Sequence, residues 1–161
     1  MHPAIADYPN RAFYGGRIQT PPRGPPADLP VPPYCVVDVA SGDRGQAASG
    51  ANETEAWGVA RVASALAVAV RARRLSVAVI TPYAAQRDML LRCLRDLNDG
   101  RPVDIEVNTV DSFQGQERDV VLVSLARSQG AGFIADAGRM CVMLTRAKHA
   151  LIVCLNPMAL V

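Results

Sequence analysis

The residues best suited to chemistry lie in one polar loop, residues 108–118 (NTVDSFQGQER), directly before the apolar run DVVLVSLA. Gly115 lets the backbone approach a ligand closely, because glycine has no side chain. Glu117 supplies a carboxylate suited to ribose hydroxyls or to a positioned water. Hydroxyl and amide groups in the same loop come from Thr109, Ser112 and Gln114. A polar turn before a strand has the same composition, so the loop alone leaves both interpretations open.

Two arginines lie on a helix that we predict at residues 138–149 (GRMCVMLTRAKH). Arg139 and Arg146 are seven residues apart, which is close to two turns, so they are expected to share a face. An apolar stripe beside that face is expected to pack on a sheet and comprises Met140, Met143, Leu144 and Ala147. Two such guanidinium groups suit phosphate oxygens, because their fork of donors matches them. Solvation at the surface is the alternative.

The sequence lacks the usual means of cradling a nucleotide. No segment matches GxxxxGK[ST], and no Asp-Glu pair follows an apolar strand to hold Mg²⁺. The cysteines are widely separated, which predicts reduced and mostly buried thiols and no metal site; they are Cys35, Cys93, Cys141 and Cys154. The chain therefore offers groups that suit phosphate without a loop that cradles it.

Apolar runs and helical periodicities alternate along the chain. Strands are predicted at 34–40, 76–82, 103–107, 119–126 and 150–157. Helices are predicted from Asn52 to the arginines at 71–74, at 83–100 and at 138–149. This order is typical of an open α/β sheet, and continuous apolar strands favour parallel pairing with helices on both faces. Ligands bind such sheets beyond the carboxyl ends of the strands, which selects Thr81-Pro82-Tyr83, the 108–118 loop and the turn at 125–128.

The first long helix has recognisable ends. Asn52 is expected to cap it, with Glu55 three residues on in the capping-box arrangement. It ends in a basic cluster, for which we favour stabilisation of the helix dipole over a nucleic-acid-binding patch; the cluster is Arg71, Arg73 and Arg74. Residues 20–33 hold seven prolines and are expected to separate the segment 1–19 from a domain at 34–161.

Composition sets the outer limits. The 161 residues suffice for one domain, and the net charge of +2 neither requires nor excludes nucleic acid. No apolar run is long enough for a membrane span, and the first residues do not resemble a signal peptide. We expect a protein of the cytoplasm or nucleus.

Four segments, in order, resemble superfamily 1 RNA and DNA helicases. VNTVDSFQGQERDVVLVSLARS resembles motif V, and GRMCVMLTRAKHALIVCLNP resembles motif VI. VAVITPYAAQRDML is similar to the TPY-containing segment of the group, and MHPAIADYPNRAFYGGRI to the segment after motif IV. The nearest subgroup includes the nonsense-mediated-decay RNA helicase, senataxin and the immunoglobulin mu-binding helicase.

The resemblance implies the second of two RecA-like domains with a P-loop NTPase fold, between which ATP binds. By analogy Gly115 and Glu117 face the nucleotide, Arg146 is the arginine finger on the γ-phosphate, and Arg139 supports the same cleft. The implied nucleic-acid side comprises Thr81, Pro82, Thr109 and Ser112, with Gln114 linking the two sites. ATP with Mg²⁺ is the implied cofactor, bound mainly by the first domain. The implied partners are that domain and single-stranded RNA or DNA, with a monomeric enzyme and no membrane.

The chain departs from the family at a few positions. Cys141, Met143 and Leu155 replace the usual residues at sites expected to serve packing. The family's Gln-Tyr-Arg precedes a methionine that is Met1 here, so we expect the reading frame to continue upstream. The expected function is the C-terminal motor domain of an ATP-dependent helicase, inactive without the Walker A/B domain. A truncated, non-catalytic nucleic-acid-binding or regulatory domain is the alternative, and a flavodoxin-like domain fits less well.

Overall fold

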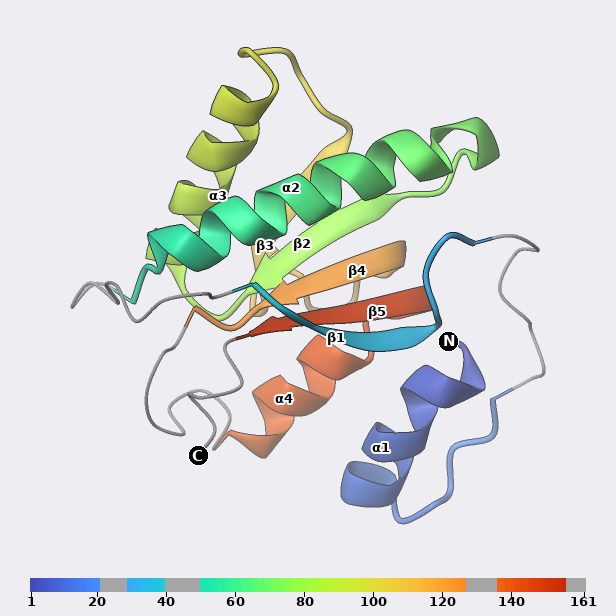
Figure 1. Ribbon diagram of the computed structural model, residues 1–161. Helices are drawn as coiled ribbons and strands as arrows, with labels where there is room; N and C mark the ends of the chain where they lie inside the picture. The colour runs from blue at the N-terminus through green and yellow to red at the C-terminus, as the bar shows by residue number, and fades with distance from the viewer. Residues whose placement is uncertain (21–28, 40–49, 127–135, 156–161) are drawn as a thin grey trace.

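The computed structural model describes residues 1–20, 29–39, 50–126 and 136–155. Five strands form one sheet in the order β1-β5-β4-β2-β3, and every pairing is parallel. The strands are β1 (Tyr34–Asp38), β2 (Val77–Thr81), β3 (Ile105–Thr109), β4 (Arg118–Ser124) and β5 (Ala147–Leu155). All carboxyl ends therefore lie at one edge of the sheet and all amino ends at the other. The predicted α/β architecture with a parallel sheet is confirmed (Figure 1).

Helices cover both faces of the sheet. The helices α2 (Glu53–Val70) and α3 (Ala84–Leu97) lie on one face, and α1 (Pro3–Tyr14) and α4 (Ala137–Leu144) lie on the other (Figure 1). The first core, under α2 and α3, includes Val59, Leu90 and Leu122. The second core, on the opposite face, includes Ile5, Phe113 and Met143.

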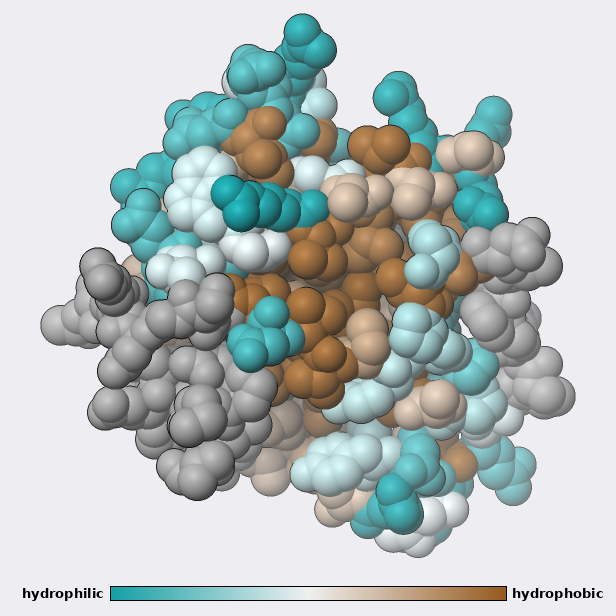
Figure 2. All heavy atoms as spheres, in the orientation of Figure 1, coloured by the Kyte–Doolittle hydropathy of each residue, from teal (hydrophilic) through white to brown (hydrophobic). Residues whose placement is uncertain are grey.

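The central strand β4 is buried on both faces, as its continuous apolar run predicts. Val120 and Leu122 pack in the first core, while Val121 and Val123 pack in the second. The edge strand β1 is less covered, and Val36 is 51% exposed. Figure 2 shows apolar side chains gathered in the middle of the molecule, on the side where β1 lies. The buried centre gives the polar loop before β4 a fixed support.

The N-terminal segment forms a helix, α1, that the sequence analysis did not predict. His2 caps it, because its Nδ1 accepts a hydrogen bond from the Ala4 amide at 3.1 Å. Gly15 ends it in a left-handed conformation with φ of 59°. The His2 amide also donates to the Lys148 carbonyl at 2.8 Å, and Ile5 is buried in the second core. The segment therefore packs against the sheet. Most of the proline-rich stretch lies outside the described residues.

Several predicted boundaries are wrong. The helix predicted at 138–149 ends at Leu144, and β5 begins at Ala147. Ala147 is buried in either case, which is why an apolar pattern of helical spacing continued across the turn. The strand predicted at 103–107 is shifted to Ile105–Thr109. The first error matters most, because it removes Arg146 from the helix.

Candidate functional site: a loop that crosses the sheet

The polar loop at residues 110–117 runs from one edge of the sheet to the other. It leaves the carboxyl end of β3 and enters the amino end of β4, and both strands pair with β2 in parallel. Val110 and Phe113 are buried in the second core, so the loop crosses on the face opposite α2 and α3. The prediction that the whole loop lies beyond the carboxyl ends is therefore wrong: its last residues lie at the amino end of β4.

The middle of the loop is tightly turned and open to solvent. Thr109 Oγ1 donates to Ser112 Oγ at 2.9 Å and accepts from the Ser112 amide at 3.3 Å. Gly115 has a φ of 79°, a conformation that favours glycine, and a Cβ added there would meet nothing within 4 Å. Gln114 and Glu117 are exposed. The glycine thus forms the turn and leaves space beside it.

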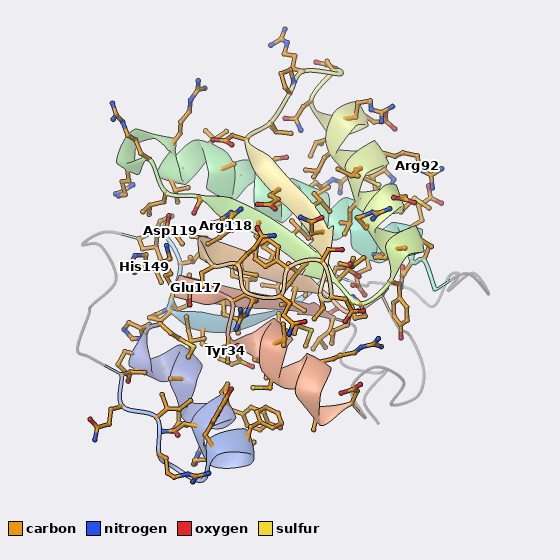
Figure 3. The ribbon with its side chains drawn as sticks, turned by 180° about the vertical axis from the view of Figure 1, so that it is seen from behind. Tyr34, Arg92, Glu117, Arg118, Asp119 and His149 are labelled. Atoms are coloured by element: carbon orange, nitrogen blue, oxygen red, sulfur yellow. The ribbon has the colours of Figure 1, made fainter. Side chains whose placement is uncertain are left out.

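Arg118 fixes the far end of the loop, although the sequence analysis gave it no role. Its guanidinium forms a salt bridge with Glu106 of β3 and lies 5.3 Å from the centre of the Phe113 ring. Its Nη1 donates to the Glu117 carbonyl at 2.8 Å. Figure 3 shows Glu117, Arg118 and Asp119 in sequence at the start of β4. Glu106 is directed to the same face of the sheet as the loop. Its acidic side chain was the feature of the sequence from which this ion pair could have been predicted.

Arg146 lies in the turn between α4 and β5, with its guanidinium against the loop. Its Nε donates to the Val142 carbonyl at 3.0 Å, and its Nη1 donates to the Gln116 carbonyl at 3.3 Å. Its Nη2 donates to Thr145 Oγ1 at 2.8 Å. All three acceptors are neutral, and among the described residues no carboxylate forms an ion pair with Arg146. The positive charge is held in place without being neutralised.

Arg139 reaches the same loop from the other end of α4. Its Nη2 lies 3.3 Å from Asp111 Oδ2, and its Nε lies 3.9 Å from Asp136 Oδ2. The prediction that Arg139 and Arg146 share a helical face is wrong, because only Arg139 is on the helix. The two arginines nevertheless contact one loop, at Asp111 and at the Gln116 carbonyl.

The residues predicted for the carboxyl edge differ in accessibility. Thr81 is fully buried and its Oγ1 has no hydrogen-bond partner, so its hydroxyl is not accessible to a ligand in this arrangement. Pro82 and Thr109 are half-buried, and Ser112 is exposed. Of the turn predicted at 125–128, only the first two residues are among those described.

A buried polar network beneath this edge was missed by the sequence analysis. Glu55 Oε1 accepts from Ser124 Oγ at 2.6 Å and from the Ala126 amide at 2.8 Å. Gln86 Nε2 donates to Ser124 Oγ at 3.0 Å, and Gln86 Oε1 accepts from the Asn52 amide at 2.7 Å. These contacts join the first turns of α2 and α3 to the end of β4. Ser124, a polar residue at the end of an apolar strand, was the feature of the sequence that could have indicated this network.

The same network corrects the predicted capping box. Asn52 caps α2, since its Oδ1 accepts from the Glu55 amide at 3.0 Å. The Glu55 carboxylate does not return to the cap and instead contacts the end of β4. Ala126 there adopts a left-handed φ of 61°, which is unfavourable for alanine. Burial raises the pKa of Glu55 above its ordinary 4.5, although the hydrogen bonds from Ser124 and Ala126 lower it.

Comparison with known proteins identifies the family. Residues 1–157 match the family AAA_12, described as an AAA domain. The chain belongs to this family. It is 33% identical over 177 residues to the Neurospora crassa homolog of regulator of nonsense transcripts 1, covering 99% of this chain and 16% of that protein. It is 33% identical to ATP-dependent helicase upf1 of Schizosaccharomyces pombe, covering 99% of this chain and 19% of the relative. Helicase SEN1 of Saccharomyces cerevisiae is 32% identical, over 94% of this chain and 8% of its own length.

A solved structure has the same fold. The C-terminal domain of a possible DNA helicase from the Lactobacillus strain WCFS1 superposes with a TM-score of 0.56 at 16% identity, covering 98% of this chain and 89% of that one. The AAA_12 chain thus has a RecA-like fold and is similar to superfamily 1 helicases, and it spans less than one fifth of these curated relatives. The described residues contain no helix able to span a membrane. They also contain no cluster of three or more potential metal ligands.

The buried network predicts a specific response to substitution and pH. Glu55→Ala should lower the free energy of unfolding by about 2 to 4 kcal/mol, because it removes the buried acceptor for Ser124 and Ala126. Glu53→Ala, at an exposed position of the same helix turn, is the control and should cost at most about 1 kcal/mol. Urea titrations followed by circular dichroism measure both. Equal losses would contradict the role of Glu55.

The pH dependence follows from the raised pKa of Glu55. Its contribution to stability is fully present below the ordinary value of 4.5 and is lost as pH rises through the higher folded-state pKa. Glu55→Gln removes this titration, so the fall in stability as the pH rises above 4.5 should be smaller than in the wild type. An unchanged slope in the glutamine variant would show that Glu55 is not the titrating group.

Proposed function

We propose that this AAA_12 chain is the second motor domain of an ATP-dependent RNA or DNA helicase, and that Arg146 supplies positive charge to the γ-phosphate. The observation that carries the proposal is the setting of Arg146, whose guanidinium is held by neutral oxygens beside an open glycine turn. A carboxylate partner would weaken its attraction for phosphate, and the described residues provide none. Membership of AAA_12 and the likeness to named helicases support the same assignment.

The chemistry of Arg146 fits this role. A guanidinium carries five N–H donors in a planar fork, and three nitrogens each donate once to Val142, Gln116 and Thr145. Two N–H groups remain for phosphate oxygens, and the anchored ones fix their direction. Because the charge is positioned before the reaction, it stabilises negative charge as it develops without reorganisation.

The remaining nucleotide contacts would come from the loop. Glu117 is exposed at the amino end of β4, on the same edge as Arg146, and its carboxylate can accept hydrogen bonds from ribose hydroxyls. Gly115 leaves open space where a nucleotide can approach the backbone. Arg139 supports the loop through Asp111. ATP with Mg²⁺ would supply the transferred phosphoryl group, with its phosphates held mainly by a first RecA-like domain.

The nucleic-acid groups would lie at the start of the loop and at the adjacent end of β2. Pro82, Thr109, Ser112 and Gln114 offer hydroxyls, an amide and backbone groups, which suit phosphates and sugars more than base edges. Thr81 would support this surface from beneath, because its side chain is buried. Since Ser112 and Gln114 lie in the loop that also reaches Arg146, nucleic-acid binding and nucleotide chemistry would act on one segment.

The test of the arginine assignment uses the chain joined to a first RecA-like domain that carries a phosphate loop. Arg146→Ala should lower ATP turnover on the order of 10³-fold while changing nucleotide affinity little, because the group acts on transition-state charge. Arg146→Lys should rescue poorly, since an ammonium lacks the fork. Arg95→Ala, an exposed position on α3, is the control. Turnover near the wild-type level in the alanine variant would rule out Arg146, and Arg139 would be tested next.

Nucleic-acid binding by the 161-residue chain itself should be weak, sensitive to salt and independent of base sequence. The contacts are small hydroxyls and amides, and a net charge of +2 gives little long-range attraction. Fluorescence anisotropy of labelled single strands of about 15 nucleotides, as RNA and as DNA, at about 50 mM and about 200 mM salt measures this. Tight binding that survives high salt, or a strong base preference, would instead favour a non-catalytic recognition domain.

A further inference from the structure

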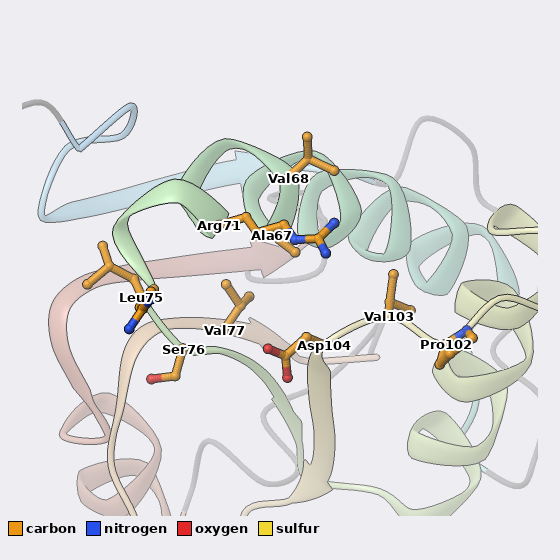
Figure 4. A pocket seen from close by; sticks show the side chains of 10 residues that line it. Ala67, Val68, Arg71, Leu75, Ser76, Val77, Pro102, Val103 and Asp104 are labelled. Atoms are coloured by element: carbon orange, nitrogen blue, oxygen red, sulfur yellow. The ribbon is translucent and has the colours of Figure 1, made fainter.

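A cavity of about 530 Å³ lies at the amino edge of the sheet, on the face covered by α2 and α3. It is formed by the end of α2, the short 3₁₀ helix η1 (Arg71–Arg73), the start of β2 and the residues before β3 (Figure 4). The loop that crosses the sheet packs on the opposite face, through Phe113. The cavity and the proposed nucleotide groups thus share the amino edge but lie on opposite faces of the sheet, and Ser76 of the cavity wall accepts from the Asp119 amide at 3.0 Å.

Two arginines line this cavity. The side chain of Arg73 contacts the end of α2, because its Nη1 donates to the Ala69 carbonyl at 3.2 Å. Arg71 and Arg74 instead contribute to the cavity wall, and both are exposed. Among the described residues no ion pair includes either of them. The helix-dipole interpretation of the basic cluster thus accounts for Arg73 but leaves two cations facing the cavity.

Arg74 occupies a backbone position that suits glycine. It ends η1 in a left-handed conformation with φ of 54°, whereas helices commonly end there with glycine or asparagine. An arginine at such a position is disfavoured by its Cβ, and residues held in sparsely populated conformations cluster at functional sites. Glycine would fit this backbone position with less strain, so the arginine side chain can be removed without loss of the turn.

The rest of the cavity wall is mainly aliphatic. Its apolar members are Ala67, Val68, Leu75, Val77, Pro102 and Val103. Val68 is 76% exposed, so a branched apolar side chain stands at the rim in water. The lining also contains Asp104, and it contains no aromatic residue on which a base could stack. Aliphatic walls beside arginines suit an aliphatic side chain flanked by carboxylates better than they suit a nucleic acid.

We propose that this cavity binds a short acidic peptide segment of a partner protein, with a leucine-type side chain inserted between α2 and the residues before β3. Arg71 and Arg74 would pair with carboxylates of the segment, and Asp104 would limit how many acidic residues fit on its side. The binding is tested without ATP, so it can succeed or fail whatever the outcome for the motor function.

The probe is a fluorescein-labelled peptide of about 12 residues in which aspartates and glutamates flank two leucines, with roughly 10 to 100 μM affinity expected for so small an interface. A second peptide replaces the leucines with serines, and a third replaces the acidic residues with lysines. Anisotropy is measured with the 161-residue chain. Only the first peptide should bind well, since each of the others loses one half of the recognition.

Charge reversal locates the site. Arg71→Glu with Arg74→Glu should weaken binding at least about ten-fold, because two charge-assisted contacts become repulsive. The matched control is Arg92→Glu with Arg95→Glu, two exposed positions on α3 that change the net charge equally. The control should shift affinity less than about two-fold. Equal losses in both double variants would show attraction by net charge alone and would overturn the proposal.

Arg74→Gly separates binding from folding. Glycine relieves the left-handed backbone, so the melting temperature should stay equal or rise while peptide affinity falls at least about five-fold. Single-stranded RNA should not displace the peptide. Failure of the leucine-bearing peptide to bind, undiminished binding by Arg74→Gly, or displacement of the peptide by RNA would each contradict an acidic-peptide site.

Discussion

The parallel direction of β3 and β4 is the constraint on which the candidate site depends. The two strands flank β2, so the chain between them must pass from the carboxyl edge to the amino edge in eight residues, 110–117. Phe113 holds that passage against the second core, and the Arg118–Glu106 salt bridge fixes its end beside β3. These contacts hold the polar segment in one path across the buried sheet. Its first residues and its last ones belong to different edges.

The path of this loop supports the proposed motor role. The beginning of the loop lies beside the ends of β2 and β3, where hydroxyl groups gather, and its end lies beside Arg146, whose guanidinium contacts the Gln116 carbonyl. In the proposed motor, this short and anchored segment would connect the two ends. At the carboxyl edge, the buried Glu55–Ser124–Gln86 network joins two helices to β4, so the support of the loop is itself braced.

The sequence predicted what depends on repeated apolar pattern and missed what depends on single contacts. Continuous runs such as DVVLVSLA indicated buried parallel strands, and the structure confirms them. The predicted position of Arg146 on a helix was wrong. Ala147 is apolar and buried at the start of β5, and a buried alanine fits a helix equally well, so periodicity could not mark the turn. Glu55 was assigned to a local cap, although it contacts residues about seventy positions away. Such a pairing is set by how α2 packs on the sheet, which no local pattern encodes.

The most direct test of the motor assignment is ATP hydrolysis by the 161-residue chain alone and after it is joined to a first RecA-like domain. The chain has no GxxxxGK[ST] loop to cradle phosphates, and the proposed charge of Arg146 cannot replace one, so alone it should give no turnover above background, with or without single-stranded RNA. The joined protein should hydrolyse ATP, and RNA or DNA should stimulate it beyond what the first domain shows by itself. Robust nucleic-acid-stimulated turnover by the chain alone, or no gain on joining, would contradict the account.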